Sequence, residues 1–497
     1  MTTDKKYTSN TSKVVKGISS QAIVTLVLGL VEIVSFSIMS RLLTKEDFGY
    51  YAAITAITAV FSTFSETGIG AAIVQQKELS QRYINNAFTL SLFFGSFISI
   101  ILFALSGPLA RSVADESMKM PLMLISGTLL LHCLTSVNNS IMHRKLQFLR
   151  MGLINLISLV ITTGVGIWLA YKGYGYYAIL TKAILSSVLT YIISLFLCNT
   201  RFGFAIDGET FKKIFSFTGW LMASSLFRNL AHQVDRLMMP RLLSVSALGA
   251  YNRPKEFIEH TSTKLNSIFD TALFPVLSSI QDNQSAFRSA FRRSLFLMNM
   301  FALLLTMAFA FNNGLLIRVF FGEQWINLQN LMIAVSCTLL FNLDGRLADC
   351  YLRSLGMTKQ QFYFRIFEFV LKTVGILIGF KWEIMGVAFS VIVTNFIAKI
   401  VKIIYIGNKL DIRPLQVVGI IMSSWRYAII MLPICLVFYI LLPGTLNGDV
   451  IMAIVFIVSA AIVFIFMPHF VGKQYEEEVF IKIKSFVNRK FNKKLFR

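Results

Sequence analysis

The sequence predicts an all-α polytopic membrane protein with about fourteen transmembrane helices, arranged as two parallel six-helix repeats followed by two extra C-terminal helices. The first observation is composition. Of the 497 residues, 55% are hydrophobic and only 14% are charged, whereas about a quarter of the residues in a soluble protein carry charge. The second is that apolar runs of about 20 residues, the length that crosses a bilayer, recur along the chain. The third is that the beginning of the chain returns in altered form roughly 200 residues later, a period that suits two copies of six spans.

The spans follow one another with short loops, so no segment is long enough to form a separate catalytic or nucleotide-binding domain. The short alternating strands of a transmembrane barrel do not occur in the sequence. We expect spans at 17–42, 49–74, 84–110, 120–142, 150–171, 176–198, 215–242, 255–279, 292–313, 326–352, 362–380, 384–406, 417–442 and 450–470.

These spans divide the chain into six parts. They are a cytoplasmic N-terminal tail (1–16), an N-lobe (17–200), a cytoplasmic linker (201–214), a C-lobe (215–410), two appended spans (411–472) and a basic cytoplasmic tail (473–497). The basic tail alternates apolar and cationic residues, which is typical of a short helix lying on an anionic membrane surface. A disordered basic tail is the alternative, and the sequence leaves both open.

The repeat is clearest where SRLLTKEDFGYY (40–51) returns as PRLLSVSALGAY (240–251), with Gly49 matching Gly249. Further along, LMLISGTLLL (122–131) returns as LMIAVSCTLLF (331–341). Because each copy holds an even number of spans, the two copies have the same orientation. Parallel repeats of this kind place a binding site between two bundles.

The formal net charge of +22 invites a nucleic-acid interpretation, but the basic residues are spread over short loops rather than gathered in one patch. About 30 of the 47 Lys and Arg residues fall in alternate segments that we assign to the cytoplasmic side, and about 10 fall on the outer side. The cytoplasmic group includes Arg365, Lys399 and Lys402. The asymmetry predicts that both termini are cytoplasmic and that the chain binds membrane lipids but no nucleic acid.

The five cysteines lie in or beside spans, and neither a CxxC motif nor a zinc-type Cys/His spacing occurs. We therefore expect no metal site and no cofactor. H⁺ or Na⁺ coupling is the one ionic requirement that the sequence suggests.

Several charges lie inside apolar spans. Arg228, His232 and Asp235 fall on one face of span 7, with Arg236 beside them. Charged side chains at membrane depth face a protein interior or a water-filled cavity. We hypothesise that Arg228 and Arg236, with Lys264 of span 8 and Arg346 of span 10, line a cationic cavity. Arginine and lysine there suit an anionic, phosphate-bearing ligand.

A second group of residues suggests ion coupling. In the repeat, Glu32 aligns with His232 and Glu66 aligns with Asp270, and Asp235 and Asp349 are further acids inside spans. Such groups could exchange protons during transport.

Structural roles are the alternative for each of these groups. Glu66 could cap a broken helix, Asp235 could brace a helix end, and Asp349 could pair with an arginine of its own helix. Glu368 and Lys372 have the i,i+4 spacing of an ion pair within one helix. The sequence leaves both interpretations open.

Two segments resemble a known family: FSTFSETGIGAAIVQQKELSQRYINNAFTLSLFFG (61–95) and VDRLMMPRLLSVSALGAYNRPKEF (234–257). They are similar to signatures of the polysaccharide transporter family, within the multidrug/oligosaccharidyl-lipid/polysaccharide (MOP) exporter superfamily. The resemblance implies two six-helix lobes forming a V around a cationic cavity. It also implies a flippase that carries undecaprenyl-diphosphate-linked oligosaccharide across the bacterial cytoplasmic (inner) membrane by alternating access, for O-antigen, capsule or exopolysaccharide assembly. The polysaccharide polymerase machinery would be its partner.

Two other classes of function compete with this one. An ion-coupled exporter of drugs or small metabolites could use the same fold, but its cavity would more often be acidic or apolar. A membrane enzyme such as a glycosyltransferase would need a large extramembrane loop or catalytic acids at the interface, and the sequence offers neither. We therefore expect a transporter that is not an enzyme and, lacking a Walker A motif, does not hydrolyse ATP.

Overall fold

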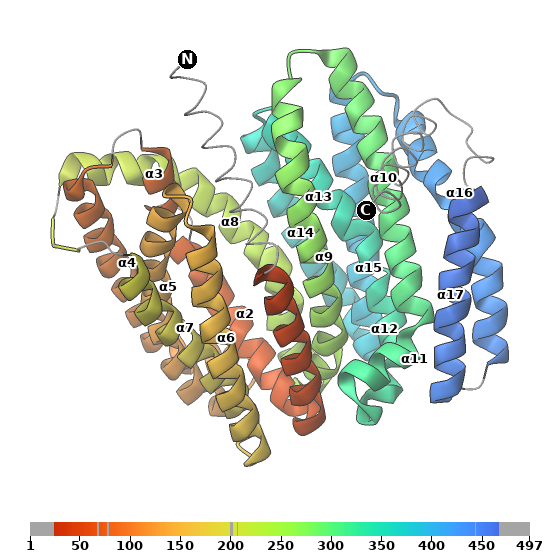
Figure 1. Ribbon diagram of the computed structural model, residues 1–497, viewed down its shortest axis with the longest axis horizontal. Helices are drawn as coiled ribbons and strands as arrows, with labels where there is room; N and C mark the ends of the chain where they lie inside the picture. Colours follow the sequence, from red (N-terminus) through yellow and green to blue (C-terminus); the bar gives the residue numbers. More distant parts are fainter. Residues whose placement is uncertain are drawn as a thin grey trace, which may run out of the picture. The chain divides into compact units, whose positions relative to one another are not determined.

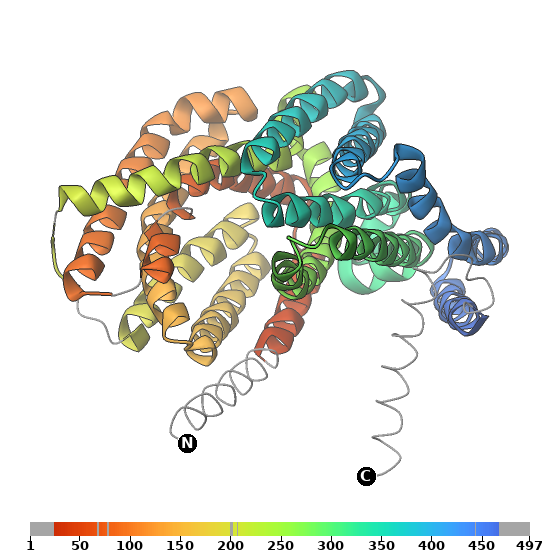
Figure 2. The ribbon, with the colours of Figure 1, turned by 90° about the horizontal axis from the view of Figure 1, so that it is seen from above.

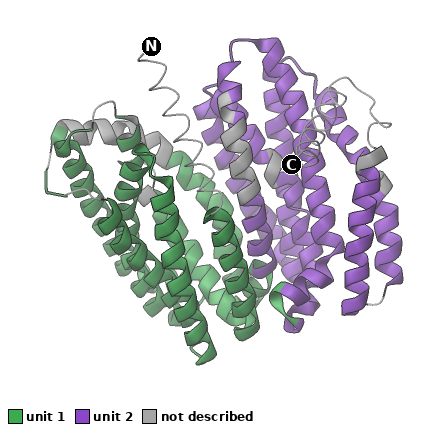
Figure 3. Cartoon of the chain, viewed as in Figure 1, with its two compact units in different colours: residues 1–252, 320–322 green, residues 253–319, 323–497 purple. Residues whose placement is uncertain are grey.

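The computed structural model describes residues 24–66, 69–76, 79–198, 202–205, 207–442 and 444–466, and within these ranges the chain is almost entirely helical with no strand. The expected N-terminal tail and basic C-terminal tail lie outside the described residues. Figure 3 shows the two compact units into which the chain groups. Unit 1 is Met1–Asn252 with Phe320–Gly322, and unit 2 is Arg253–Val319 with Glu323–Arg497.

Unit 1 is a bundle of long apolar helices that starts with the helix Val24–Leu42. Helices α4 to α7 run side by side within it (Figure 1). The other elements of unit 1 are α2 (Lys45–Glu66), α3 (Ile69–Gln75), α4 (Gln81–Val113), η1 (Glu116–Met118), α5 (Lys119–Arg144), α6 (Phe148–Tyr171), α7 (Tyr176–Cys198), α8 (Gly208–Leu242) and the first turns of α9 (Val245–Ser279).

Unit 2 contains the rest of α9 and a second bundle. The appended helices α16 and α17 pack against each other and against α10, at one edge of the unit (Figure 2). The elements are α10 (Gln284–Phe311), α11 (Asn313–Leu316), η2 (Ile317–Phe321), η3 (Glu323–Leu328), α12 (Gln329–Ser336), α13 (Leu339–Ser354), α14 (Thr358–Gly379), η4 (Phe380–Trp382), α15 (Glu383–Lys409), α16 (Pro414–Leu441) and α17 (Leu446–Phe466).

The predicted class, an all-α multi-pass membrane protein, is confirmed. Where the structure describes them, the predicted spans are mostly helical, although 49–74 is divided between α2 and α3 and 326–352 among η3, α12 and α13. Among the described residues, nine helices are long and apolar enough to cross a membrane, or ten when the bent pair Pro414–Arg426 and Met431–Leu441 counts as one span. One of the nine, Thr358–Lys409, comprises both α14 and α15. The 35-residue helices α8 and α9 and the 22-residue helix α2 are not among them. The number of fourteen crossings stays a prediction.

The linker between the two sequence copies is fixed to unit 1. The backbone N–H of Gly203 donates to Asn85 Oδ1 at 3.1 Å, and that of Ala205 donates to Thr89 Oγ1 at 3.2 Å. Helix α8 then packs along α2. For this reason the boundary between the two compact units lies inside α9, after Asn252. From the repeat, we expected the boundary between the two lobes at 201–214. The lobe boundaries read from the repeat stay predictions.

Candidate functional site

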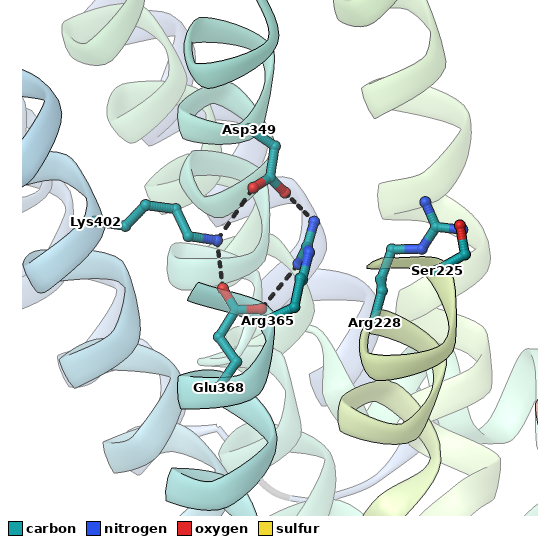
Figure 4. A network of polar contacts seen from close by, with 6 residues as sticks. All are labelled: Ser225, Arg228, Asp349, Arg365, Glu368 and Lys402. Carbon is teal, nitrogen blue, oxygen red and sulfur yellow. Dashed lines mark hydrogen bonds and ion pairs between the residues drawn. The ribbon is translucent and has the colours of Figure 1, made fainter. Parts of the chain in front are cut away.

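Four charged side chains from three helices meet inside unit 2 (Figure 4). Asp349 comes from α13, Arg365 and Glu368 come from α14, and Lys402 comes from α15. The guanidinium of Arg365 pairs with Asp349 Oδ2 and, at 2.8 Å, with Glu368 Oε2. The Lys402 amine pairs with Asp349 Oδ1 at 3.2 Å and with Glu368 Oε1. We call these four residues the charge quartet.

The charge quartet is buried and electrically balanced. The side chain of Lys402 is 1% exposed and that of Asp349 is 9% exposed. Two carboxylates face two cations, so the formal charges of the group sum to zero. Each carboxylate accepts from both cations, which is the arrangement that compensates the loss of water around buried charges.

The helical repeat and two antiparallel connections bring these residues together. Arg365 and Glu368 are three residues apart and therefore lie on one face of α14. The short turn η4 reverses the chain, so that Lys402 of α15 returns to the level of this face. Asp349 lies five residues before the end of α13, close to the turn that leads into α14.

A second buried lysine, Lys399, lies one turn before Lys402 on α15. Its amine donates to Asn299 Oδ1 of α10 at 3.1 Å and to the carbonyl oxygen of Leu340 at 2.9 Å. Leu340 lies directly after a break that separates α12 from α13, where the predicted span 326–352 is interrupted. Lys399 therefore joins α10 and α15 to the beginning of α13.

Lys399 and Lys402 correct one assignment made from the sequence. We counted both among the basic residues of a cytoplasmic segment, although they fall within the predicted span 384–406. In the structure both lie inside α15 and are only 5% and 1% exposed, so they are interior residues and not exposed loop residues. The side of the membrane on which they lie stays a prediction. The signal that could have revealed them is the pair of acids inside spans, Asp349 and Glu368, which need cations from neighbouring helices. The i,i+3 spacing of the two lysines on one face of α15 is consistent with such a role.

The sequence suggested that Asp349 pairs with an arginine of α13 and that Glu368 pairs with Lys372. The ion pairs described for these two acids involve Arg365 and Lys402 instead. The carboxylate oxygens of Asp349 contact Arg365 and Lys402, and Arg353 of α13 adds a smaller electrostatic attraction. Those of Glu368 contact the same two cations. The pairing of Glu368 with Lys372 stays a prediction.

The predicted polar face of α8 divides into an exposed part and a buried part. Arg228 and His232 are exposed, and Nη2 of Arg228 lies 3.4 Å from Ser225 Oγ (Figure 4). Asp235 is fully buried and accepts from the Tyr251 hydroxyl at 3.0 Å.

Arg228 is far from either end of its helix. It lies 20 residues after Gly208 and 14 residues before Leu242, which corresponds to about 30 Å and about 20 Å along the helix axis. In the predicted span 215–242, an exposed guanidinium this far from both helix ends is stabilised by water or an anion beside it.

The other predicted cations differ in their surroundings. Arg346 is exposed on α13 and makes no hydrogen bond or ion pair within the described part of the chain. Arg236 is half-buried, and its Nη1 donates to Gln233 Oε1 at 3.1 Å. The side chain of Lys264 lies outside the described residues.

The structure describes the surroundings of only some of the candidate ion-coupling residues. Glu32 is half-buried on the first helix, while the side chains of Glu66 and Asp270 lie outside the described residues. Where side chains are described, no three His, Cys, Asp or Glu residues are grouped as a metal site would need. Ion coupling through these residues stays a prediction.

Comparison with known proteins gives one family and several relatives. A family model described as "Polysaccharide biosynthesis protein" matches residues 38–330. The lipopolysaccharide biosynthesis protein WzxC of Escherichia coli (strain K12) is 24% identical over 435 residues, which cover 87% of this chain and 86% of WzxC.

Two solved structures share the fold. The lipid II flippase MurJ in an inward closed conformation superposes with a TM-score of 0.71 at 15% identity, over 90% of this chain and 98% of MurJ. An inward-facing multidrug resistance MATE family transporter of the MOP superfamily superposes with a TM-score of 0.65 at 14% identity, over 80% of this chain and 98% of the transporter. The likeness confirms the predicted fold class.

Proposed function

The chain belongs to the polysaccharide biosynthesis protein family, and from this premise we propose that it is a flippase for lipid-linked oligosaccharides. Its substrate would be an oligosaccharide repeat unit on undecaprenyl diphosphate, carried from the cytoplasmic to the outer leaflet of a bacterial cytoplasmic membrane. Transport would proceed by alternating access and serve O-antigen, capsule or exopolysaccharide assembly, with both termini of the chain in the cytoplasm. The polysaccharide polymerase that uses the delivered unit would be its partner.

The observation that carries this proposal is the exposed guanidinium of Arg228, deep within α8. A lipid-linked oligosaccharide has one strongly anionic part, the diphosphate, which must cross the membrane with the sugars. The planar fork of an arginine donates two parallel hydrogen bonds to phosphate oxygens. Arg346, exposed on α13 of unit 2, would be a second cation for the same ligand, together with Lys264 and Arg236.

The energy for transport would come from an ion gradient or from removal of the product, without catalysis by the chain itself. Coupling to H⁺ or Na⁺ would use acids or histidine inside the helices. The candidates are Glu32, Glu66, His232, Asp235, Asp270 and Asp349.

The proposal is tested in a strain that lacks this chain, by locating the lipid-linked repeat units with a membrane-impermeant glycosidase or lectin. We expect the units to accumulate where the probe cannot reach them in intact cells, and surface polymer to disappear. Lysed cells of the same strain, in which both leaflets are accessible, are the control.

One result in the deletion strain would contradict the flippase proposal. If the units of the deletion strain still reach the outer face, the chain moves something else. The fold, which a multidrug resistance transporter shares, would then favour export of small molecules. Comparing drug sensitivity with and without the chain would test that function.

A further inference from the structure

Helix α13, which carries Arg346, is the second half of a broken helix. The first half, α12, ends at Ser336, and α13 begins at Leu339. At the break, the backbone N–H of Thr338 donates to the carbonyl oxygen of Val335 at 3.0 Å, which is the i,i+3 spacing of a 3₁₀ turn. Because such a turn inside a helix acts as a hinge, the orientation of α13 depends on the helices that pack against it.

The break has an origin in the sequence. In the first copy, LM (122–123) and TLL (128–130) are separated by four residues, and α5 runs unbroken across them. In the second copy, LM (331–332) and TLL (338–340) are separated by five residues. One extra residue would turn the following part of an α-helix by about 100°, since a turn holds 3.6 residues. The break absorbs this residue, so that α13 has a direction of its own.

Two lysines of α15 hold α13 on either side of Arg346. Lys399 Nζ donates to the carbonyl oxygen of Leu340, six residues before Arg346, at 2.9 Å. Lys402 Nζ pairs with Asp349, three residues after Arg346, at 3.2 Å (Figure 4). At 1.5 Å per residue, these contacts lie about 9 Å and about 4.5 Å from Arg346 along the helix axis. Since α15 is unbroken, both lysines fix α13 to one continuous helix.

Helix α10, which is also unbroken, adds further contacts. Asn299 Oδ1 of α10 accepts from Lys399 Nζ at 3.1 Å, and Ser294 Oγ of α10 lies 2.8 Å from the hydroxyl oxygen of Tyr351 on α13. Tyr351 is 0% exposed, whereas Arg346 is exposed. One part of the α13 surface is thus buried and fixed, while the guanidinium of Arg346 stays accessible.

We propose that Lys399 and Lys402 are positioning residues for Arg346. They hold the half-helix α13 in the orientation in which the Arg346 guanidinium meets the diphosphate of the substrate, and they do not contact the substrate themselves. The inference rests on the proposed function, in which Arg346 is a second cation for the diphosphate, and deepens it by naming the residues that aim this cation. It also gives a reason for burying two lysines, which is costly in the interior of a membrane protein.

A double substitution tests the proposal through transport. We expect Arg346→Ala and Lys399→Met each to lower the rate of surface polymer formation by at least about tenfold at equal protein level, because both remove the same hydrogen bonds to the diphosphate. For that reason the chain with both substitutions should be no slower than Arg346→Ala alone. Lys409→Met is the matched control, since Lys409 is an exposed lysine at the end of α15. Losses that multiply in the double variant, or a normal rate in either single variant, would overturn the proposal.

A nitroxide spin label beside Arg346 tests the positioning without any substrate. Gly345→Cys provides the place, because a Cβ atom there meets nothing within 4 Å beyond its chain neighbours and the backbone of its own helix. The label is attached to a chain whose five natural cysteines are replaced by alanine. In the purified full-length protein, we expect Lys399→Met to add a more mobile component to the spectrum and Lys409→Met to leave the spectrum unchanged. Identical spectra with and without Lys399 would contradict the proposal.

The second lysine covers the case in which Lys399→Met does not accumulate. Lys402→Met is then combined with Glu368→Gln, which keeps the formal charge of the quartet at zero, and is measured with the same label and together with Arg346→Ala. An unchanged spectrum, or losses that multiply, would again contradict the proposal. A deletion strain that still makes surface polymer would instead contradict the flippase proposal, and the spectra would still show whether the lysines hold α13.

Discussion

Replacing Lys402 with methionine should lower the free energy of unfolding by about 3–5 kcal/mol, the cost of leaving a buried charge without its partner. Lys402 contacts both acids of the charge quartet and is 1% exposed. Methionine keeps most of the side-chain volume, so the loss would come from charge rather than from a cavity. Two carboxylates would then share only Arg365. Chemical unfolding of the purified protein in detergent measures the change.

A second substitution separates charge from packing. Lys402→Met combined with Glu368→Gln leaves one cation and one carboxylate, Arg365 and Asp349, so the formal charge of the quartet is again zero. We expect the double variant to be more stable than Lys402→Met alone. Equal stability of the two variants would show that charge balance is not what Lys402 provides.

The corresponding helices of the first sequence copy are joined by different contacts. The repeat offset of about 210 residues pairs α5, α6 and α7 with α13, α14 and α15. In unit 1 the contacts described between these helices include the amide of Asn138 donating to Ser194 Oγ at 2.7 Å, Ser158 Oγ donating to the carbonyl oxygen of Ser186 at 3.2 Å, and Arg150 Nη1 donating to the carbonyl oxygen of Leu197 at 3.3 Å. Since the contacts described between the corresponding helices of the first copy are single hydrogen bonds rather than a cluster of four buried charges, we expect the charge quartet to serve transport as well as stability.

The fold class could be predicted because its signals are local. Span length, hydropathy and the repeat can all be read without knowing which helix packs on which. The charge quartet could not be predicted in this way, since the i,i+4 rule finds partners only within one helix. Lys402 is 53 residues from Asp349 and 34 residues from Glu368, so their pairing depends on the packing of three helices.

Arg228 also shows which features of the site follow from the sequence and which depend on packing. Its helical position and its neighbours on the face of α8 follow from the sequence, and the structure adds that its side chain is exposed. The cationic cavity stays a prediction. That Asp235 turns inward to the Tyr251 hydroxyl does not follow, because residues 228 and 235 share a face in a helical projection. A helical projection does not show which residues of one face are exposed and which are buried against neighbouring helices.

Arg228→Ala should reduce the rate of surface polymer formation by roughly 10- to 100-fold, because a hydrogen bond to a charged group contributes about 1.5–3 kcal/mol. Since Arg228 is exposed, its loss should leave protein level and unfolding nearly unchanged, and this distinguishes it from the charge quartet. Polymer formation is followed by surface labelling at equal protein level. Arg82→Ala is the matched control, because Arg82 is an exposed arginine in the first turn of α4.

Arg228→Lys gives the sharper comparison. Lysine keeps the positive charge but replaces the planar fork with a single point charge, so we expect a rate between those of the alanine variant and the original chain. A lysine variant as slow as the alanine variant would mean that two parallel hydrogen bonds to the diphosphate are needed. A normal rate in Arg228→Ala would remove Arg228 from the substrate's route, and the exposed guanidinium would then need only water around it.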